Sequence, residues 1–333
     1  MDVCRAWRRC STDPRELDGL DRRLHPRRWI MLREQLALSH YHRLLNLSTG
    51  ETIKVDLLEL NAHMMLTSTP EGLLMLLHER IYIRLLNPLT HHLIEFPPVT
   101  TLLKSNGHGV LLEGQLLVWG SFIDTGSISF VLHVPGLLGI AKPGDACWKI
   151  IRYESSTYTT PLMFMGRFYC VTDDNLMVLE TSIDPRLEVA VELHHPVSPA
   201  YRTAHLVDNG GKLMLVHREL GCLRYDVCHV DLEKKALFPV KGFNEWALFL
   251  GKGFSFSVCT RVFPFIKGST IYLSFDFGEK FDGKVDSYYV PHRSAKPTNY
   301  DVWGNRYRVL PSPHSVVDCL SLCNTVKRCC VNV

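Results

Sequence analysis

Gly211-Lys212-Leu213-Met214-Leu215-Val216 is one of five stretches in which a glycine leads a short apolar run. The five leading glycines are Gly72, Gly114, Gly166, Gly211 and Gly268. Successive glycines lie 42, 52, 45 and 57 residues apart. Periods of this size, with a short apolar strand and no long amphipathic helix between copies, are typical of β-propeller blades. The sequence therefore predicts an all-β fold, a closed ring of blades.

Each repeat continues with a second strand that ends in a turn. The clearest copy is Arg-Leu-Leu-Asn-Pro-Leu-Thr at 84–90, and Leu-Leu-Asn-Leu-Ser-Thr-Gly at 44–50 matches it upstream. Asn and Asp favour such turns because their side chains bond the backbone two residues on, and Pro presets φ. A third short strand follows, as at 52–55, and 28–32 fits a first strand. These copies predict a β-propeller of about six blades over residues 25–310; a β-sandwich or two stacked β-domains are the alternative folds.

The apolar residues on both faces of the Gly-led strands suit burial between neighbouring blades. We therefore expect the five strands to occupy equivalent positions near the axis of the ring. Large aromatic side chains fill the wedge-shaped gaps between blades. Four are expected to be largely buried there: Trp119, Phe168, Tyr169 and Tyr272.

Composition is compatible with one well-packed domain, because 333 residues with 46% apolar content can bury a large core. The best uninterrupted apolar run, 73–77, is far shorter than the roughly 18 residues of a membrane span, so no membrane contact is expected. The arginine-rich start has no apolar signal region, which argues against secretion. We expect a protein of the cytoplasm and/or nucleus whose eleven cysteines, Cys170 and Cys259 among them, are reduced.

No motif of known chemistry stands out. The chain has no Gly-x-Ser-x-Gly, no phosphate-binding glycine loop and no His-Glu-x-x-His. In the pairs 91–92 and 194–195, neighbouring histidines on a strand would point to opposite faces and would not share a metal. The net charge of +3 is not concentrated in the body of the chain, so a nucleic-acid partner is not expected. We predict a non-enzymatic protein without cofactor or metal; an enzyme that uses the central channel remains the alternative.

The amino terminus, Met-Asp-Val-Cys-Arg-Ala-Trp-Arg-Arg-Cys at 1–10, carries a separate signal. Val3, Ala6 and Trp7 lie on one side of a helical turn. Ten residues are too few for a helix that is stable alone, so this segment is expected to pack on something. It resembles the last helix of an F-box, with the pattern Val-Cys-x-x-Trp followed by basic residues.

The body resembles the plant F-box-associated β-propeller family with a KIB-type domain. The matching stretches are 86–90 with 96–98, 165–169, 206–208 leading into 212–216, 250–251 with 255–258, and 268–274. The resemblance covers most of residues 1–290. It divides the chain into an F-box C-terminal remnant and linker (1–24), a KIB-type β-propeller (25–310) and a tail (311–333) with a possible short helix.

The resemblance implies a substrate-recognition subunit of an SCF-type ubiquitin ligase, in which the F-box docks to a Skp-type adaptor and the propeller loops bind a protein substrate. An F-box has several helices, and only its end is represented here. We therefore expect residues 1–333, as a monomer, to bind the adaptor weakly or not at all, with Val3, Ala6 and Trp7 as the candidate contacts. The alternative is a propeller scaffold that binds or modulates a partner protein with no ubiquitin link. An upstream coding extension with an intact F-box would discriminate between them.

Overall fold

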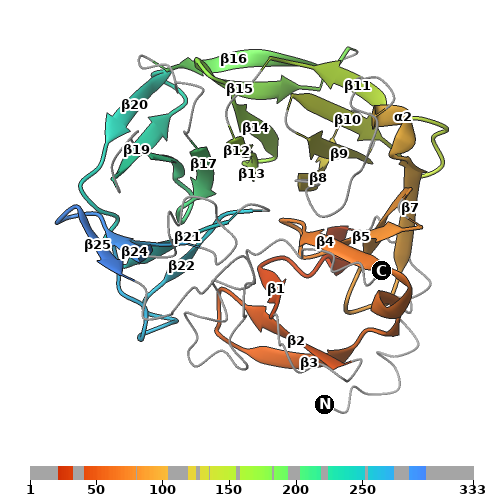
Figure 1. Cartoon of the computed structure of the whole chain (residues 1–333), viewed down its shortest axis with the longest axis horizontal. Coiled ribbons are helices and arrows are strands. Elements are labelled where there is room, and N and C mark those ends of the chain that lie inside the picture. The colour runs from red at the N-terminus through yellow and green to blue at the C-terminus, as the bar shows by residue number, and fades with distance from the viewer. Residues whose placement is uncertain are drawn as a thin grey trace, which may run out of the picture.

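The computed structural model forms a closed ring of six β-sheets around a central axis (Figure 1). It describes residues 22–32, 41–79, 81–103, 119–124, 128–134, 136–154, 158–181, 184–193, 203–218, 224–251, 254–273 and 285–297. The predicted all-β propeller of about six blades is confirmed. The helices predicted at the amino terminus and in the tail lie outside the described residues. In the described part, no helix is long and apolar enough to cross a membrane.

Each sheet is one blade of the ring. Blade 1 contains β1 (Trp29–Met31), β2 (Tyr41–Asn46) and β3 (Thr52–Asp56). Blade 2 contains β4 (Met64–Ser68), β5 (Leu74–His78), β6 (Tyr82–Leu86) and β7 (Leu93–Pro98). Blade 3 contains β8 (Trp119–Asp124), β9 (Ile128–Val134), β10 (Leu137–Ala141) and β11 (Lys149–Arg152). Blade 4 contains β13 (Leu162–Phe164), β14 (Arg167–Val171), β15 (Asn175–Glu180) and β16 (Arg186–Glu192).

The last two blades have five strands each. Blade 5 has the order β12 (Tyr158–Thr160), β17 (Thr203–Asp208), β18 (Leu213–Arg218), β19 (Tyr225–Asp231) and β20 (Ala236–Pro239). Blade 6 has the order β22 (Phe256–Cys259), β21 (Trp246–Leu250), β23 (Thr270–Leu273), β24 (Val285–Tyr289) and β25 (Ser294–Pro297). Among the described strands, β12–β17 and β21–β23 are parallel pairs and all other pairs are antiparallel. The short helices are η1 (Arg22–Leu24), η2 (Leu58–Ala62) and α2 (Thr100–Leu103).

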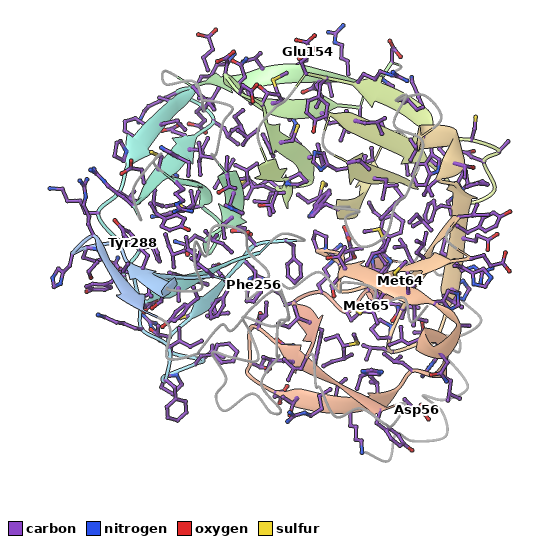
Figure 2. All side chains as sticks on the ribbon, in the orientation of Figure 1. Asp56, Met64, Met65, Glu154, Phe256 and Tyr288 are labelled. Atoms are coloured by element: carbon purple, nitrogen blue, oxygen red, sulfur yellow. The ribbon has the colours of Figure 1, made fainter. Side chains whose placement is uncertain are left out.

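The apolar runs bury both faces because each face belongs to a different boundary between blades. Successive side chains of a strand point to opposite faces. In β5, Met75 and Leu77 therefore pack with blade 3, whereas Leu74 and Leu76 pack with blade 1. Six apolar clusters are arranged in this way, one at each boundary. Side chains fill the spaces between neighbouring blades, as Figure 2 shows.

One of these clusters closes the ring between the two ends of the described chain. It joins Ile30 and Leu45 of blade 1 to Phe249 and Val258 of blade 6. Burial of apolar surface stabilises by roughly 25 cal/mol per Å². Closure therefore rests on the same kind of packing that joins the other blades.

The Gly-led strands are equivalent in four copies of the five. The strands β5, β14, β18 and β23 are each third from the outer edge of their sheet, as are β1 and β9. The four Gly-led strands are not the innermost strands, since one or two further strands lie between each of them and the axis (Figure 1). The prediction that all five strands are equivalent is wrong at the Gly114 copy, because Trp119 at its end begins the inner-edge strand β8. Gly126, twelve residues later, precedes the equivalent strand β9. Both stretches are apolar and glycine-led, so the pattern alone did not separate them.

The predicted Asn and Asp turns join the two outermost strands of their blades. In each turn, the Oδ1 atom of the Asn or Asp accepts a hydrogen bond from the backbone N–H two residues later. The N–H of Ser48 donates to Asn46 (2.8 Å), that of Leu89 to Asn87 (3.0 Å) and that of Glu233 to Asp231 (3.1 Å). Four residues after each of these side chains, the backbone takes a positive φ, at Gly50 (76°), His91 (62°) and Lys235 (51°). The turns thus share one local geometry although their sequences differ.

The aromatic predictions hold for three of the four side chains. Trp119, Phe168 and Tyr169 are buried, and the rings of Trp119 and Phe168 lie 5.3 Å apart at the boundary of blades 3 and 4. Tyr272 is only partly buried. Its hydroxyl accepts a hydrogen bond from the backbone N–H of Lys267 (3.2 Å), which places the polar end of this ring among loop residues.

The turn between β13 and β14 offers a stabilising substitution. Its two residues, Met165 and Gly166, have φ values of 48° and 78°, and Met165 is 77% exposed. Two-residue hairpin turns with two positive φ values favour Asn-Gly. We expect Met165→Asn to raise the free energy of unfolding by about 0.5–1 kcal/mol in urea titrations, because Asn tolerates the left-handed backbone that costs Met about 1–2 kcal/mol. Met165→Ala, which keeps that backbone cost, should show no comparable gain; an equal gain would contradict this reason.

Candidate interaction surface

The sequence-predicted contacts Val3, Ala6 and Trp7 lie outside the described residues. The described segment closest to them, 22–28, is fixed on blades 2 and 3. The Leu24 carbonyl accepts a hydrogen bond from Asn87 Nδ2 (3.0 Å), and the His25 ring stacks on Phe122 at 5.4 Å. A Cβ added at Gly72 would lie 1.9 Å from the Pro26 carbonyl oxygen, so backbone meets backbone there. The chain therefore enters the ring along a defined path over these two blades.

The connections between strands carry the most exposed large apolar side chains of the described residues. Phe265 is 86% exposed, Met165 77% and Leu58 55%. Phe265 lies between β22 and β23, Met165 between β13 and β14, and Leu58 in η2 between β3 and β4. Loops on a rigid scaffold often carry binding function. Sequence reasoning did not single out Phe265; the signal was an apolar run, Phe-Pro-Phe-Ile at 263–266, in which proline interrupts any strand.

A buried polar group joins the inner strands of blades 5 and 6. His205 Nδ1 lies 3.1 Å from Thr160 Oγ1 and 3.3 Å from Ser255 Oγ. The two hydroxyl oxygens are 3.4 Å apart. His205 and Thr160 are each 1% exposed and Ser255 is 8% exposed. A serine hydroxyl thus lies beside a histidine, but both are buried. The contacts join β12 and β17 to Ser255, the residue before β22.

A second buried histidine lies at the boundary of blades 3 and 4. His133 Nε2 shares a hydrogen bond of 2.5 Å with the Tyr153 hydroxyl, and the two rings are stacked. Burial raises the pKa of Tyr153 above its usual range and that of Cys170 to about 12. Cys170 is thus a protonated thiol, and it forms no disulfide bond, as is also the case for Cys228 and Cys259. That Cys170 and Cys259 are reduced in the cell stays a prediction.

The two buried histidines make stability depend on pH. Burial lowers the pKa of both His133 and His205 from 6.5 to about 3. Between these values the unfolded chain binds protons that the folded chain does not, so stability falls as pH falls from about 6.5 towards 3. Each histidine contributes at most about 1.4 kcal/mol per pH unit. We expect His133→Gln, which keeps a hydrogen-bonding side chain beside Tyr153, to reduce the pH slope in urea unfolding at pH 7 to 4. An unchanged slope would show that His133 is protonated when folded.

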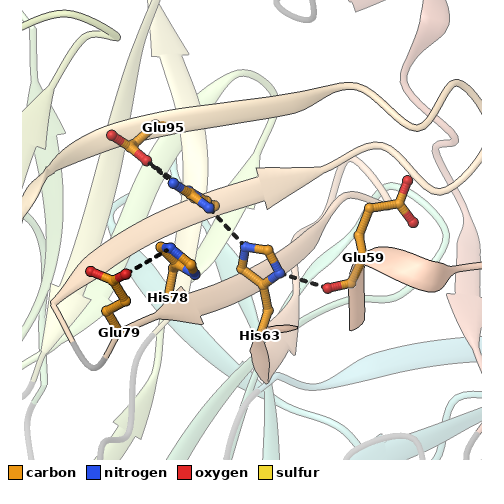
Figure 3. Close-up of polar contacts among 6 residues, drawn as sticks. Glu59, His63, His78, Glu79 and Glu95 are labelled. Atoms are coloured by element: carbon orange, nitrogen blue, oxygen red, sulfur yellow. Dashed lines mark hydrogen bonds and ion pairs between the residues drawn. The ribbon is translucent and has the colours of Figure 1, made fainter. Parts of the chain in front are cut away.

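A polar network joins η2 to strands β5, β6 and β7 of blade 2 (Figure 3). The Arg84 guanidinium donates to Glu95 Oε2 (2.6 Å from Nε) and lies 3.1 Å from His63 Nε2. Guanidinium groups only donate, so His63 Nε2 accepts and its Nδ1–H donates to the Glu59 carbonyl at 2.6 Å. The ring of His78 lies 4.8 Å from that of His63. The network holds the His63 ring between Arg84 and Glu59.

This arrangement is a structural network, since Arg84 holds the His63 nitrogen that a metal would need. Across the described residues, no group of three or more His, Cys, Asp or Glu side chains is placed to hold a metal ion. His91 of the predicted histidine pair is exposed and contacts Glu59 Oε1 at 3.0 Å. The pair at 194–195 and the cysteines of the tail lie outside the described residues.

Comparison with known proteins identifies the family. The model of the KIB1-4 beta-propeller family matches residues 28–302. This chain belongs to the KIB1-4 beta-propeller family. Its KIB1-4 domain is a β-propeller interaction module, as the resemblance of the sequence implied.

Solved structures and curated proteins were compared with the chain as well. Among solved structures, the WD40 domain of SCAP from fission yeast is similar at 11% sequence identity and a TM-score of 0.35. The alignment covers 68% of this chain and 60% of that chain, so the chain spans less than two thirds of its length. No curated protein matches the chain.

Proposed function

We propose that this KIB1-4 propeller binds a protein partner through the connections between its strands and performs no chemistry itself. The observation that carries the proposal is the placement of Phe265, Met165 and Leu58, the most exposed large apolar side chains described, in those connections. Exposed apolar side chains in loops suit partner binding, whereas the histidine–hydroxyl group at His205 is closed to solvent. A monomer in the cytoplasm and/or nucleus, with no bound cofactor, nucleic acid or membrane, fits this function.

The finer proposal is that the propeller recognises substrates for an SCF-type ubiquitin ligase. The support is the F-box-like pattern at Val3, Cys4 and Trp7 together with membership of the KIB1-4 family. Affinity in protein interfaces is concentrated in a central cluster of a few residues. Val3, Ala6 and Trp7 offer only a part of such a cluster, so residues 1–333 bind a Skp-type adaptor weakly or not at all.

The test combines capture and direct binding. Tagged residues 1–333 are used to capture partners for mass spectrometry, and purified Skp-type adaptor is titrated into the same protein. A reproducible partner without adaptor, and adaptor affinity weaker than micromolar, support the proposal as stated. Micromolar or tighter adaptor binding would restore an ordinary ligase subunit. A reproducible partner that is no ubiquitin-ligase substrate favours the scaffold alternative, and the absence of any partner contradicts both.

A further inference from the structure

Three segments meet at one end of blade 6. They are 241–245 before β21, 260–269 between β22 and β23, and 290–293 between β24 and β25. The backbone N–H of Ser269 donates to the Trp246 carbonyl (2.7 Å), and that of Val290 donates to the Ser269 carbonyl (3.1 Å). The N–H of Thr260 donates to the Glu245 carbonyl (2.8 Å). The segments therefore form one continuous surface at the lower left of the ring in Figure 1, where the strands of blade 6 lie.

The backbone at this end is held in costly conformations. Asn244, Ser269 and Arg293, one from each segment, have φ values of 53°, 52° and 51°. Ser269 Oγ accepts a hydrogen bond from the Phe243 N–H (3.0 Å) and lies 3.3 Å from the Asn244 carbonyl, to which it donates. A Cβ at Gly268 would lie 2.2 Å from the same carbonyl. Strained backbone persists where the surroundings over-determine it, and such residues cluster at functional sites.

The loop holds Phe265 outward. Phe263, two residues before it, is 6% exposed, and Ile266, directly after it, is 3% exposed. Both pack in the cluster that closes the ring. Phe265 itself is 86% exposed. Because its neighbours are anchored, the backbone of Phe265 has a defined place and presents the ring to solvent. An exposed aromatic ring is the type of side chain that anchors partners in interfaces.

The charged side chains of these three segments are mostly basic. Lys241, Arg261, Lys267 and Arg293 are all exposed. Within the three segments the one acidic residue is Glu245, which pairs with Arg261 at 2.5 Å. Lys267 Nζ lies 3.4 Å above the ring of Tyr289, which steadies it at the surface. Since the chain as a whole carries a net charge of only +3, this is a local concentration of positive charge.

We propose that this surface, formed by Lys241, Arg261, Phe265, Lys267 and Arg293 and called the blade-6 surface, binds an acidic peptide segment of the protein partner. An apolar side chain of that peptide packs on Phe265, and flanking carboxylates face the lysines and arginines. Complementary charge steers association and selects partners. One aromatic ring suits a single apolar anchor, whereas single-stranded nucleic acid stacks on successive aromatic rings. The inference rests on the proposed function and names the place and the chemistry of the partner.

The test begins with random peptides displayed on phage and selected on immobilised residues 1–333. Enriched peptides are synthesised with fluorescein, and their binding is measured by anisotropy at low and high salt. We expect acidic residues flanking a Leu or Phe, and affinity that falls with salt. Phe265→Ser and Lys267→Glu should each weaken binding at least about tenfold. Phe238→Ser and Lys212→Glu, both exposed on blade 5, should change it less than about twofold.

Three results would overturn the blade-6 surface. Selection yields no acidic peptides, or both blade-6 variants bind the selected peptides like the wild type, or labelled oligouridylate binds more tightly than the peptides. Any protein captured by residues 1–333 is then tested with Phe265→Ser/Lys267→Glu. A partner that binds this double variant unchanged leaves the proposed function standing and moves its site elsewhere. Unchanged unfolding midpoints establish that the variants are folded, as expected for exposed positions.

Discussion

Replacing Phe130 by alanine is expected to lower the free energy of unfolding by about 3–5 kcal/mol. Phe130 is completely buried at the boundary of blades 2 and 3. Its ring centroid lies 4.9 Å from that of Phe96 and 5.4 Å from that of Phe122. The substitution removes the aromatic contacts and leaves a cavity that rigid neighbouring sheets fill poorly. Equilibrium urea unfolding, followed by tryptophan fluorescence, measures the change.

Gly120 provides the matched control for this cavity. A Cβ at Gly120 would lie 2.2 Å from Phe130 Cζ, so Gly120→Ala alone overpacks the site and should cost about 1–3 kcal/mol. In the Phe130→Ala background the added methyl group enters space that the ring has left. The double variant should therefore be more stable than the sum of the single changes predicts, with a coupling of about 1 kcal/mol or more. Strict additivity would mean that Gly120 and Phe130 do not compete for the same space.

Local patterns were enough to predict the blades. The run 213–216 has apolar side chains on both faces, and each face meets a different neighbouring blade: Leu213 and Leu215 one, Met214 and Val216 the other. A strand with two buried faces and a turn at either end can be read from consecutive residues. The same local reading failed at Gly114, because the glycine-led run 126–132 nearby has the same character and the choice between them depends on pairing with β10.

Features that depend on distant pairing could not be predicted. Strand β12 pairs in parallel with β17, although the whole of blade 4 lies between them in the sequence. Strand β23 pairs in parallel with β21 because β22, which separates them in the sequence, pairs with the other edge of β21. The contact of Thr160 with Ser255 joins residues 95 positions apart. No local pattern encodes such a pairing. The blade-6 surface is of the same kind, since its three segments meet only when β21, β23 and β24 have paired.

Gly72→Ala should cost at least about 3 kcal/mol, and Gly211→Ala only about 1 kcal/mol. Both glycines have nearly the same backbone, with φ of 84° and 85°. The cost of a side chain in this conformation is therefore shared. A Cβ at Gly72 would lie 1.9 Å from the Pro26 carbonyl oxygen, whereas a Cβ at Gly211 would meet nothing within 4 Å. Since the obstacle is backbone, the segment 22–28 must move for the alanine to fit.

The displaced segment gives this prediction a local measurement. Two hydrogen bonds fix the backbone of this segment. The Arg27 N–H donates to the His25 carbonyl (2.8 Å), and Asn87 Nδ2 donates to the Leu24 carbonyl. In Gly72→Ala, trypsin should cleave after Arg27 or Arg28 much faster than in Gly211→Ala, because proteolysis follows local opening. Equal unfolding midpoints and equal cleavage in the two variants would show that the segment is not fixed on blade 2. Faster cleavage in Gly72→Ala alone would establish that contact with blade 2 is what orients the chain as it enters the propeller.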